Sequence, residues 1–241
     1  MKASMTGFDV RAVSQELDLW AGAYVKKAYM PHYEQIVLRI NPKESDQFDL
    51  VIVRGQRVYT SQRDRPMPMT PPPFAMVLRK HLKNARLTGV EQLGFDRVLL
   101  FRFDTKHGKR SLSVELFRDG NVILMDEEDI IIQPLTHASY AGRTIKKGEV
   151  YIPPPAAVDP YTLTPDVIKD IFSDSDRDLV STLGGKINLG GVYANAVCDR
   201  AKLEPNSPCE DADASVIHAS LTHFLDELKT SKQGFLIVNP T

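Results

Sequence analysis

The sequence predicts an α+β fold in two parts, a β-sandwich with packed helices and then an α-helical module. Between residues 24 and 133, short apolar segments of strand length alternate with turns rich in Gly, Pro, Asn and Asp. Only two stretches before residue 160 show the spacing of an amphipathic helix. From Thr164 to Lys229 the spacing is helical almost throughout. We therefore expect a first domain over residues 1–170 and a helical domain over residues 171–241.

The first helix is predicted from four apolar residues that recur at helical spacing: Val10, Val13, Leu17 and Trp20. Thr6 or Asp9 can cap its free first-turn N–H groups, and Gly22 ends it. Four strands follow in two pairs, the first interrupted by Pro31 and the second by Gly55, over residues 24–30, 33–40, 48–53 and 57–60. The chain is therefore expected to begin with one helix and two hairpins.

A rigid extended segment is predicted next, because five prolines lie between residues 66 and 73. Helical spacing returns over residues 74–86, with a proline at the start, where its missing N–H costs nothing. Arg79, Lys83 and Arg86 lie at i, i+4 and i+7 and would share one face of this helix.

Four or five further strands are predicted, over residues 87–92, 97–103, 111–116, 121–125 and 130–133. Asp119-Gly120-Asn121 joins two of them, because these residue types favour the positive φ of a tight hairpin turn. Loops are expected from Thr136 to Pro160, and Thr164-Pro165-Asp166 opens the first helix of the second domain.

The net charge conceals an uneven distribution. The 30 Lys and Arg nearly balance the 31 Asp and Glu, for a formal charge of −1, which excludes a generally basic coat for nucleic acid. Residues 74–110 nevertheless carry nine cations against three acids, whereas residues 203–229 carry six acids against Lys229 alone. The basic stretch is either a patch for an anionic partner or a solvated face that pairs with acids elsewhere in the fold.

The composition favours a soluble intracellular protein. No apolar run approaches the ~18 residues of a membrane span, and the first nine residues lack the apolar core of a secretory signal. Cys198 and Cys209 are too few for a disulfide framework or a four-thiolate zinc site. His218 and His223 lie five apart, a spacing that does not place two zinc ligands on one helix face. We expect no metal, no cofactor and no membrane partner.

A glycine-rich turn at residues 183–195 lies between two predicted helices. Its backbone N–H groups suit an anion such as phosphate, but the turn can equally be a tight connection without a ligand. The helix, turn and helix resemble the helix-hairpin-helix module of formamidopyrimidine-DNA glycosylases, which implies a glycosylase-like scaffold for the β-sandwich as well. Those enzymes use an N-terminal proline as nucleophile and a four-cysteine zinc finger, whereas this chain has no proline before Pro31 and only two cysteines. We therefore expect no enzyme.

Further motifs occur in this order: residues 8–13 with Asp9-Val10-Arg11, residues 74–83, Leu93-Gly94-Phe95-Asp96-Arg97, residues 115–124 and residues 143–151. Together they resemble the N-terminal domain of the NFACT family, from about residue 4 to the end of the chain. This family includes archaeal and bacterial ribosome-associated quality-control proteins and the eukaryotic nuclear export mediator factor. Its bacterial members have often been labelled fibronectin-binding proteins.

The resemblance implies a cytoplasmic, ribosome-associated protein. Family members bind large ribosomal subunits obstructed by peptidyl-tRNA and recruit aminoacyl-tRNA, so that the ribosome adds a C-terminal tail to the stalled chain. Their N-terminal domain contacts tRNA through residues that correspond here to Asp9, Arg11, Asp96 and Arg97. Full-length members continue with a coiled coil and a further RNA-binding domain. We therefore expect the chain to be part of a longer protein, interrupted in or just after a β segment at residues 234–241.

Each of these residues also has a structural interpretation. Arg can fork onto phosphates or stack on a base, and Asp can accept from base amino groups or ribose hydroxyls. Asp9 could instead cap the first helix or pair with Arg11 or Arg97, and Arg97 could pair with Asp96 or a nearby strand acid. The cations of the second helix either bind RNA phosphates or form a solvated face: Arg79, Lys80, Lys83 and Arg86.

Three hypotheses of function follow. The first is a non-enzymatic tRNA- and ribosome-binding domain of a quality-control factor, whose partners are tRNA and the large subunit with its peptidyl-tRNA; self-association stays open. The second is a DNA-repair glycosylase or lyase, which borohydride trapping on an abasic duplex would reveal. The third is a fibronectin-binding adhesin, which requires a salt-resistant, RNA-independent affinity for fibronectin.

Overall fold

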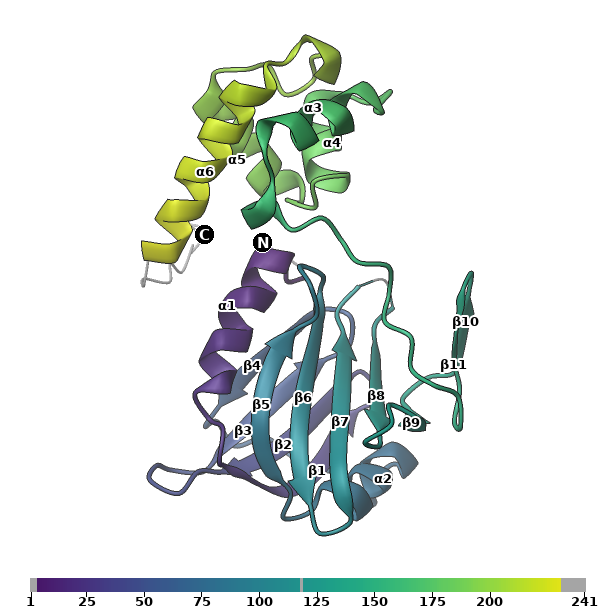
Figure 1. Cartoon of the computed structure of the whole chain (residues 1–241). Helices are drawn as coiled ribbons and strands as arrows, with labels where there is room; N and C mark the ends of the chain where they lie inside the picture. Colours follow the sequence, from purple (N-terminus) through teal and green to yellow (C-terminus); the bar gives the residue numbers. More distant parts are fainter. Residues whose placement is uncertain (1–3, 118, 231–241) are drawn as a thin grey trace. The chain divides into compact units, whose positions relative to one another are not determined.

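The computed structural model describes residues 4–117 and 119–230, and its contacts divide the chain into two compact units, Met1–Ala156 and Ala157–Thr241 (Figure 1). The sequence predicts the division after residue 170, whereas the contacts divide the chain after Ala156. Residue 170 lies inside α3 (Pro165–Ser173), which belongs to the second unit. This helix packs against α6 (Ala214–Thr230) of the second unit. The β segment expected at residues 234–241 lies outside the described residues.

The strands of the first unit that form its large sheet lie close to the predicted ranges. They are β1 (Tyr24–His32), β2 (Gln35–Asn41), β3 (Phe48–Val53), β4 (Arg57–Ser61), β5 (Arg86–Gln92), β6 (Val98–Thr105), β7 (Gly108–Glu115), β8 (Asn121–Met125) and β9 (Ile131–Pro134). Two predicted turns are confirmed, since Gly55 between β3 and β4 has a φ of 65° and Gly120 before β8 a φ of 67°. A side chain would be strained in this left-handed region, so glycine at these positions is a reliable turn signal.

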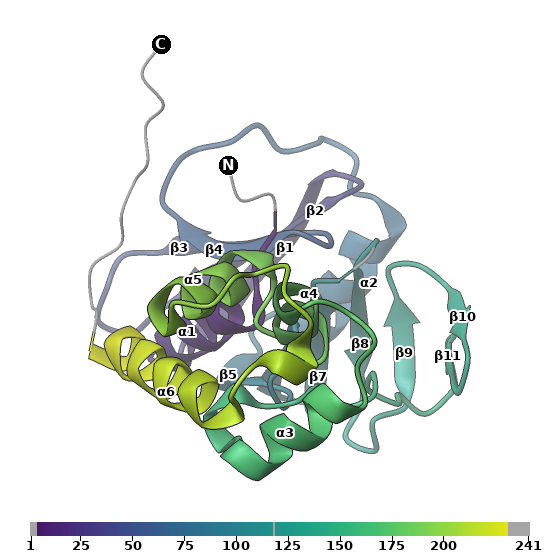
Figure 2. The ribbon, with the colours of Figure 1, turned by 90° about the horizontal axis from the view of Figure 1, so that it is seen from above.

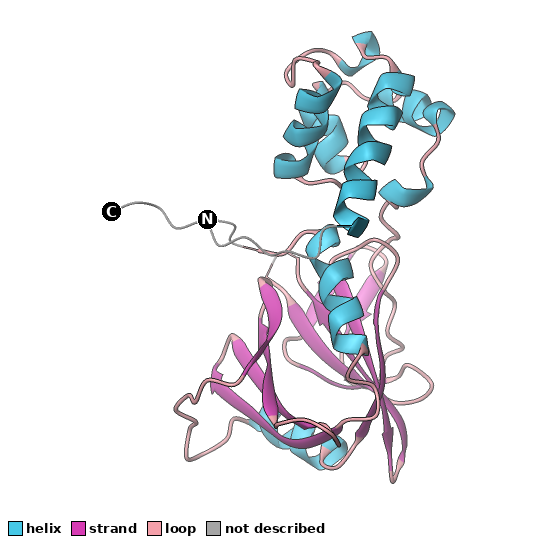
Figure 3. Ribbon diagram, turned by 90° about the vertical axis from the view of Figure 1, so that its left-hand side faces the viewer, coloured by secondary structure: helices cyan, strands magenta, loops and turns pink. Residues whose placement is uncertain are grey.

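These strands form one antiparallel sheet, which within the described residues has the order β4-β3-β2-β1-β5-β6-β7-β8-β9 (Figure 1). β1 and β5 pair only at Tyr24 and Arg86, and the sheet bends there into two halves (Figure 3). Both halves contribute side chains to one apolar core, for example Leu38 and Leu50 from the first half and Phe101 from the second. The predicted α+β class, with helices packed on a large antiparallel sheet, is confirmed.

Helix α1 (Gly7–Asp18) begins with a capping box. The Asp9 carboxylate accepts the N–H of Thr6 at 2.6 Å, and the Thr6 hydroxyl oxygen accepts the N–H of Asp9 at 3.4 Å. Each of the two capping residues offered by the sequence thus satisfies a backbone donor of the other. Val10 and Leu17 point from this helix into the core.

Helix α2 (Pro73–Leu82) ends earlier than the spacing predicts. Lys83 already has extended backbone, and Asn84 takes a φ of 61°. The N–H of Asn84 donates to the carbonyl oxygen of Val25 at 2.8 Å instead of continuing the helix. This bond and the burial of Leu87 in the core outweigh the helical periodicity.

The prediction that Arg79, Lys83 and Arg86 share one helix face is therefore wrong. Arg79 lies in α2, Lys83 caps its C-terminus, and Arg86 is the first residue of β5. Side chains repeat every 3.6 residues in a helix and every two in a strand, so the change of conformation separates the three cations.

The sequence predicts loops from residue 136 to residue 160, but part of this segment forms strands. β10 (Ala138–Tyr140) and β11 (Arg143–Ile145) form a short antiparallel hairpin. Ile145 is buried in a cluster with Tyr151 beside the sheet. Strands of three residues are too short to produce a periodic signal, and their stability comes from contacts with distant residues.

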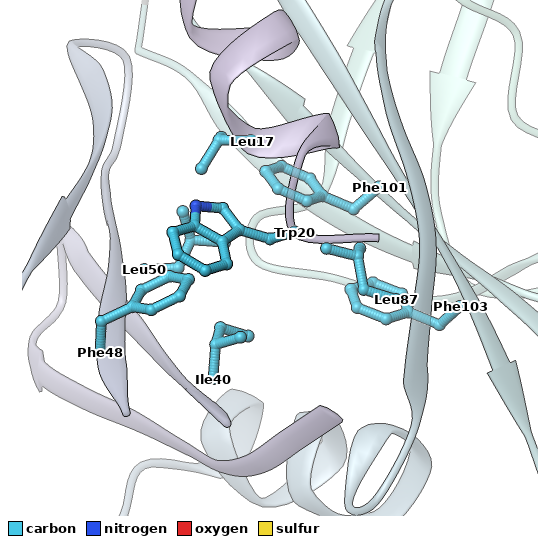
Figure 4. Close-up of a pocket in the computed structure, with 8 residues that line it drawn as sticks. All are labelled: Leu17, Trp20, Ile40, Phe48, Leu50, Leu87, Phe101 and Phe103. Carbon is cyan, nitrogen blue, oxygen red and sulfur yellow. The ribbon is translucent and has the colours of Figure 1, made fainter. Parts of the chain in front are cut away.

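The core between the two halves packs around Trp20. Figure 4 shows the indole among the side chains of Leu17, Ile40, Phe48, Leu50, Leu87, Phe101 and Phe103. The space left there is only about 10 Å³ and its lining is apolar. Such a space is at the limit for one water and offers it no polar partner, so it is a packing feature and not a ligand site.

The second unit is helical over its described residues, with η1 (Pro160–Thr162), α3, α4 (Leu179–Gly185), α5 (Gly191–Ala201), η2 (Cys209–Asp211) and α6 (Figure 2). Helix α4 packs against α5, and α6 packs against α5 and α3. Thr164 caps α3 and Asp178 caps α4, each through its side-chain oxygen. In the part of the chain that is described, no helix has the length and apolar character to cross a membrane.

Candidate nucleic-acid interface

The loop between β5 and β6, residues 93–97, lies against the N-terminus of α1. Gln92, the last residue of β5, donates from Nε2 to the carbonyl oxygen of Gly7 at 2.9 Å and to that of Asp96 at 2.8 Å. One side-chain amide therefore bonds both to the first residue of α1, directly before the Asp9-Val10-Arg11 motif, and to the loop motif, although Gly7 and Gln92 are 85 residues apart.

Arg11 makes further bonds between α1 and this loop. Its Nε donates to Oε1 of Gln92 at 3.0 Å, and its Nη2 donates to the carbonyl oxygen of Gly94 at 3.3 Å. The guanidinium carbon lies 5.0 Å from the centroid of the Phe95 ring, within the range of a cation–π contact. Arg11 therefore holds the loop against the helix.

Phe95 anchors the loop in the protein. Its side chain is fully buried and meets Phe8 edge to face, with the ring centroids 4.8 Å apart. Gly7 permits this approach, since a Cβ there would lie 2.8 Å from Cε1 of Phe95 and 3.0 Å from its carbonyl oxygen. The close approach of the loop to helix α1 thus depends on glycine, which has no side chain, at position 7.

Asp96 and Arg97 follow at the partly exposed end of the loop. Oδ1 of Asp96 accepts the N–H of Arg97 at 2.6 Å, and the carbonyl oxygen of Arg97 accepts the N–H of Leu116 at 2.7 Å. Their backbone is thus fixed while both side chains remain partly exposed. Together with Asp9 in the capping box, the structure brings the two predicted motifs to one end of the sheet.

An open groove of about 680 Å³ runs beside Asp9. Met5 and Val13 contribute apolar surface to it, and Arg57 and Tyr59 contribute a cation and an aromatic ring from β4. A mostly apolar lining with a few polar groups is typical of pockets that take an organic group.

The four cations predicted on the second helix do not join this site. The Nε of Arg79 donates to the carbonyl oxygen of Ala28 at 2.7 Å, and Arg86 pairs with Asp104 at 2.8 Å. The other two side chains are exposed: Lys80 and Lys83. Arg79 and Arg86 are thus engaged within the protein, and the role of the four cations as phosphate contacts stays a prediction.

The length of β5 separates the two groups. Arg86 and Gln92 are its first and last residues, and seven strand residues span roughly 20 Å. Arg86 therefore cannot belong to the same small contact as the Asp/Arg motifs.

His81 on α2 is half-buried, at the boundary of the core. Burial holds its pKa below the ordinary value, and the nearby charges of Arg110, Lys80 and His107 act in the same direction. The unfolded chain therefore takes up a proton on His81 more readily than the folded chain does. The stability that neutral His81 contributes is complete above the unfolded pKa of about 6.5, and it is lost as the pH falls below that value.

We expect His81→Gln to reduce the loss of thermal stability between roughly pH 7 and pH 5, the range in which a histidine titrates. The measurement is the melting temperature of the native chain and the variant at several pH values. His137→Gln, at an exposed position, is the matched control and should retain the native pH dependence. An equal loss of stability in native chain and His81→Gln would contradict this interpretation.

The glycine-rich turn connects α4 and α5 tightly. The N–H of Gly190 donates to the carbonyl oxygen of Gly184 at 3.0 Å, and the N–H of Leu189 donates to that of Leu183 at 3.2 Å. Both leucines are buried, and Gly190 has a φ of 75°. The structural interpretation as a close helix connection is confirmed, and an anion at this turn stays a prediction.

Cys198 is fully buried in α5, and burial raises the pKa of its thiol to about 11. A thiol with so high a pKa stays protonated at neutral pH and is therefore a poor nucleophile. Over residues 4–117 and 119–230, no three His, Cys, Asp or Glu side chains gather in a way that could hold a metal ion.

Sequence reasoning overlooked Gln92 and assigned no role to Phe95. Gln92 is a polar residue at the end of a strand, directly before a Gly-containing turn, and such a position is a signal for a side chain that bonds to backbone. An aromatic residue between Gly94 and Asp96 is likewise a signal that the turn has a buried anchor.

A profile of the family described as NFACT N-terminal and middle domains matches residues 6–240. The chain is 36% identical over 215 residues to the archaeal Rqc2 homolog aRqcH of Methanocaldococcus jannaschii, covering 85% of the chain and 32% of the relative. It is 35% identical over 136 residues to the human ribosome quality control complex subunit NEMF, covering 56% of the chain and 12% of the relative. The chain thus spans about a third or less of the length of these relatives.

The same fold occurs in solved structures. The N-terminal part of the fibronectin/fibrinogen-binding protein from Streptococcus suis has a TM-score of 0.72 at 26% identity, over 91% of this chain and 85% of that one. The fibrinogen binding protein from Staphylococcus aureus has a TM-score of 0.75 at 20% identity, over 93% and 82%. The Lactococcus lactis Fpg bound to abasic-site DNA has a TM-score of 0.51 at 13% identity, over 95% and 81%, which shows a shared scaffold alone.

Proposed function

The chain belongs to the NFACT family, and we propose that it is the tRNA-binding part of a ribosome-associated quality-control factor. Relatives named as Rqc2 homologues or ribosome quality control subunits, in an archaeon, a bacterium and human, support this role. The whole protein would act in the cytoplasm on large ribosomal subunits that carry peptidyl-tRNA. There it would recruit aminoacyl-tRNA for C-terminal tailing of the stalled chain.

The observation that carries the proposal is the bridge through Gln92. It places two acids and two cations at one end of the sheet: Asp9, Arg11, Asp96 and Arg97. Arg can fork onto a phosphate or stack on a base, and Asp can accept from base amino groups and ribose hydroxyls. A patch of cations alone would hold any phosphate backbone, whereas this mixed set can select features of a folded RNA.

The groove beside Asp9 extends the same site. Sequence-specific RNA recognition relies on unstacked bases that lie on aromatic rings and bond along their edges. Tyr59 offers the ring and Asp9 an acceptor beside it. An unpaired base of the tRNA is the group that this groove would receive.

We further propose that this chain catalyses no reaction and that the ribosome forms the peptide bonds of the tail. The buried, late-ionising thiol of Cys198 supports this view. In the second unit, α4, the glycine-rich turn and α5 would form a helix-hairpin-helix module, which the tight bonds across the turn support.

The double variant Asp96→Ala/Arg97→Ala is expected to weaken tRNA binding at least about tenfold, because each charged contact is worth ~1.5–3 kcal/mol and 1.4 kcal/mol is a factor of about ten. The bond from Gln92 ends on the backbone carbonyl of Asp96, so the loop should keep its position. The measurement is the tRNA affinity of the chain over a salt series from roughly 50 to 200 mM.

Arg102→Ala/Glu91→Ala is the matched control. It removes an arginine and an acid from an exposed ion pair between β5 and β6 that belongs to neither group of predicted contacts, and it should retain the native affinity. Circular dichroism would establish that both variants are folded. Native affinity at every salt for folded Asp96→Ala/Arg97→Ala would remove the Asp/Arg site from the proposal.

Two further assays distinguish the alternative functions. Borohydride trapping on an abasic duplex should produce no adduct, and an adduct would favour a glycosylase or lyase. The similarity to the fibronectin/fibrinogen-binding protein of Streptococcus suis makes fibronectin the other probe. A salt-resistant affinity for fibronectin in RNA-free protein would favour the adhesin.

A further inference from the structure

Tyr29 on β1 is surrounded by positive charge. The Nζ of Lys27 lies 5.3 Å from the centroid of its ring, and the guanidinium carbons of Arg39 and Arg79 lie 5.1 and 5.3 Å from it. The three cations come from β1, β2 and α2. A cation–π contact contributes only ~0.5–1 kcal/mol at exposed sites, so the ring alone does not explain why the fold gathers three like charges.

Asp49 on β3 balances part of this charge. Its buried carboxylate accepts from Nε and Nη2 of Arg39 at 2.9 and 3.3 Å. That hydrogen bond is the main cause that raises the pKa of Arg39, and the charge of Asp64 adds to it. Two carboxylates therefore act on the cations.

Arg65 adds a fourth cation whose bonding is incomplete. Its Nε lies 3.9 Å from Oδ2 of Asp49, too far for a hydrogen bond. This nitrogen is buried, and it has no hydrogen-bond partner among the described residues. A buried donor without an acceptor costs ~1–3 kcal/mol. The missing acceptor and the excess of positive charge both indicate an anion.

We propose that the Tyr29 cluster binds a phosphate group of RNA, where the cluster is defined as Tyr29 with Lys27, Arg39, Arg65 and Arg79. The proposal rests on the proposed function, because it takes tRNA as the source of the phosphate. It adds a second contact that shares no residue with the Asp/Arg site. It also assigns a role to Arg79, one of the cations singled out in the sequence.

The chemistry of the cluster fits a phosphate. The guanidinium group of arginine can donate two parallel hydrogen bonds to phosphate oxygens, and the ammonium group of lysine adds a mobile positive charge. Arg39 is oriented by Asp49, and Arg79 by the carbonyl oxygen of Ala28, so little side-chain entropy remains to be lost on binding. Tyr29 keeps the three cations around one ring.

Lys27→Gln tests the proposal with tRNA. Each phosphate contact that is lost should reduce the slope of log affinity against log salt by about 1. We expect this reduction for Lys27→Gln, at an exposed position where the substitution should leave the fold intact, and for Arg79→Gln. Arg102→Gln removes an exposed cation paired with Glu91 on the neighbouring strand and should leave the slope unchanged.

Inorganic phosphate tests the cluster without RNA. The melting temperature, followed by the fluorescence of Trp20, is compared in sodium phosphate and in sodium chloride of equal ionic strength. The gain in phosphate should be larger for the native chain than for Lys27→Gln or Arg79→Gln, and the variants also control for the general stabilising effect of phosphate.

The outcomes separate the two proposals. An unchanged salt slope in both variants overturns the Tyr29 cluster, and if Asp96→Ala/Arg97→Ala still weakens tRNA binding, the proposed function stands. If the native chain binds no tRNA at any salt, the proposed function fails and the cluster fails as an RNA contact. A phosphate gain confined to the native chain would then identify a site for a free phosphate instead.

Discussion

Replacing Glu115 with alanine is expected to lower the free energy of unfolding of the first unit by about 3–5 kcal/mol. Glu115 ends β7 and is 1% exposed, and its two carboxylate oxygens accept from Nη1 and Nη2 of Arg143 at 2.7 and 2.9 Å. The hydroxyl of Tyr151 donates to the same carboxylate at 3.0 Å. Without it, a buried guanidinium lacks its counter-charge, and this cost exceeds that of the lost hydrogen bonds.

The damage should extend to the β10–β11 hairpin. Arg143 opens β11, and its Nη1 also donates to the carbonyl oxygen of Ile152 at 3.2 Å. Burial raises the pKa of Tyr151, and the charge of Glu115 adds to the effect, so this hydroxyl remains a donor at neutral pH. Two guanidinium nitrogens of Arg143 and the hydroxyl of Tyr151 thus donate to the one carboxylate of Glu115. Limited proteolysis of Glu115→Ala should therefore cleave between residues 136 and 150 sooner than in the native chain.

Urea unfolding followed by the fluorescence of Trp20 measures this loss, since Trp20 is the one tryptophan of the chain and lies in the core of the first unit. Glu91→Ala is the matched control. Its carboxylate is 53% exposed and pairs with Arg102 at 2.9 Å, and exposed pairs are worth only ~0–1 kcal/mol. A loss for Glu115→Ala as small as that of the control would show that the buried pair does not stabilise the unit.

Phe95→Ala is expected to cost about 3–5 kcal/mol, the range for removing a buried phenyl ring. Its ring fills the space between Phe8 and Gly7 at the N-terminus of α1. The same substitution should weaken tRNA binding, because the loop that carries Asp96 and Arg97 loses its anchor. One change would thus affect both stability and the proposed site.

Two controls separate these effects. Phe95→Leu keeps most of the buried volume and should cost less than about 1.5 kcal/mol while retaining tRNA affinity. Tyr33→Ala removes an aromatic ring that is 63% exposed and should change neither property. Native stability in Phe95→Ala would contradict the role of this ring as an anchor. Native tRNA affinity in a destabilised Phe95→Ala would instead show that RNA binding does not depend on the anchored loop.

Elements with strong local signals were predicted well. The capping residues of α1, Thr6 and Asp9, form a capping box, and the glycines at residues 55 and 120 adopt the positive φ expected of hairpin turns. These features depend on residues within a few positions of each other. The preference of each residue type for its local conformation is therefore sufficient to predict them.

Elements that depend on distant partners were predicted less well. The end of α2 is decided by the bond from Asn84 to Val25 on β1, which the spacing of residues 74–86 does not reveal. Helix propensities differ by less than about 0.7 kcal/mol among ordinary residues, so one sheet bond and one buried leucine can reverse them. The hairpin β10–β11 likewise depends on the pair of Arg143 with Glu115.

The candidate site shows both cases. Asp9, Arg11, Asp96 and Arg97 were named from motifs, and the structure brings those motifs together. It also shows bonds that motifs cannot reveal, since Arg11 holds a loop and Asp9 caps a helix. A role in RNA binding must therefore be compatible with these internal contacts.

By itself, the sequence determined the α+β class and the order of most elements, because periodic burial, helix caps and turn residues act over a few neighbouring positions. The two Asp/Arg motifs came from its resemblance to the NFACT family. Only the tertiary structure decided that Arg86 leaves the predicted helix face, that Gln92 joins the two motifs and that three cations gather around Tyr29. These arrangements join residues that are far apart in the chain. Their energies come from burial and long-range bonds, which local preferences are too weak to oppose.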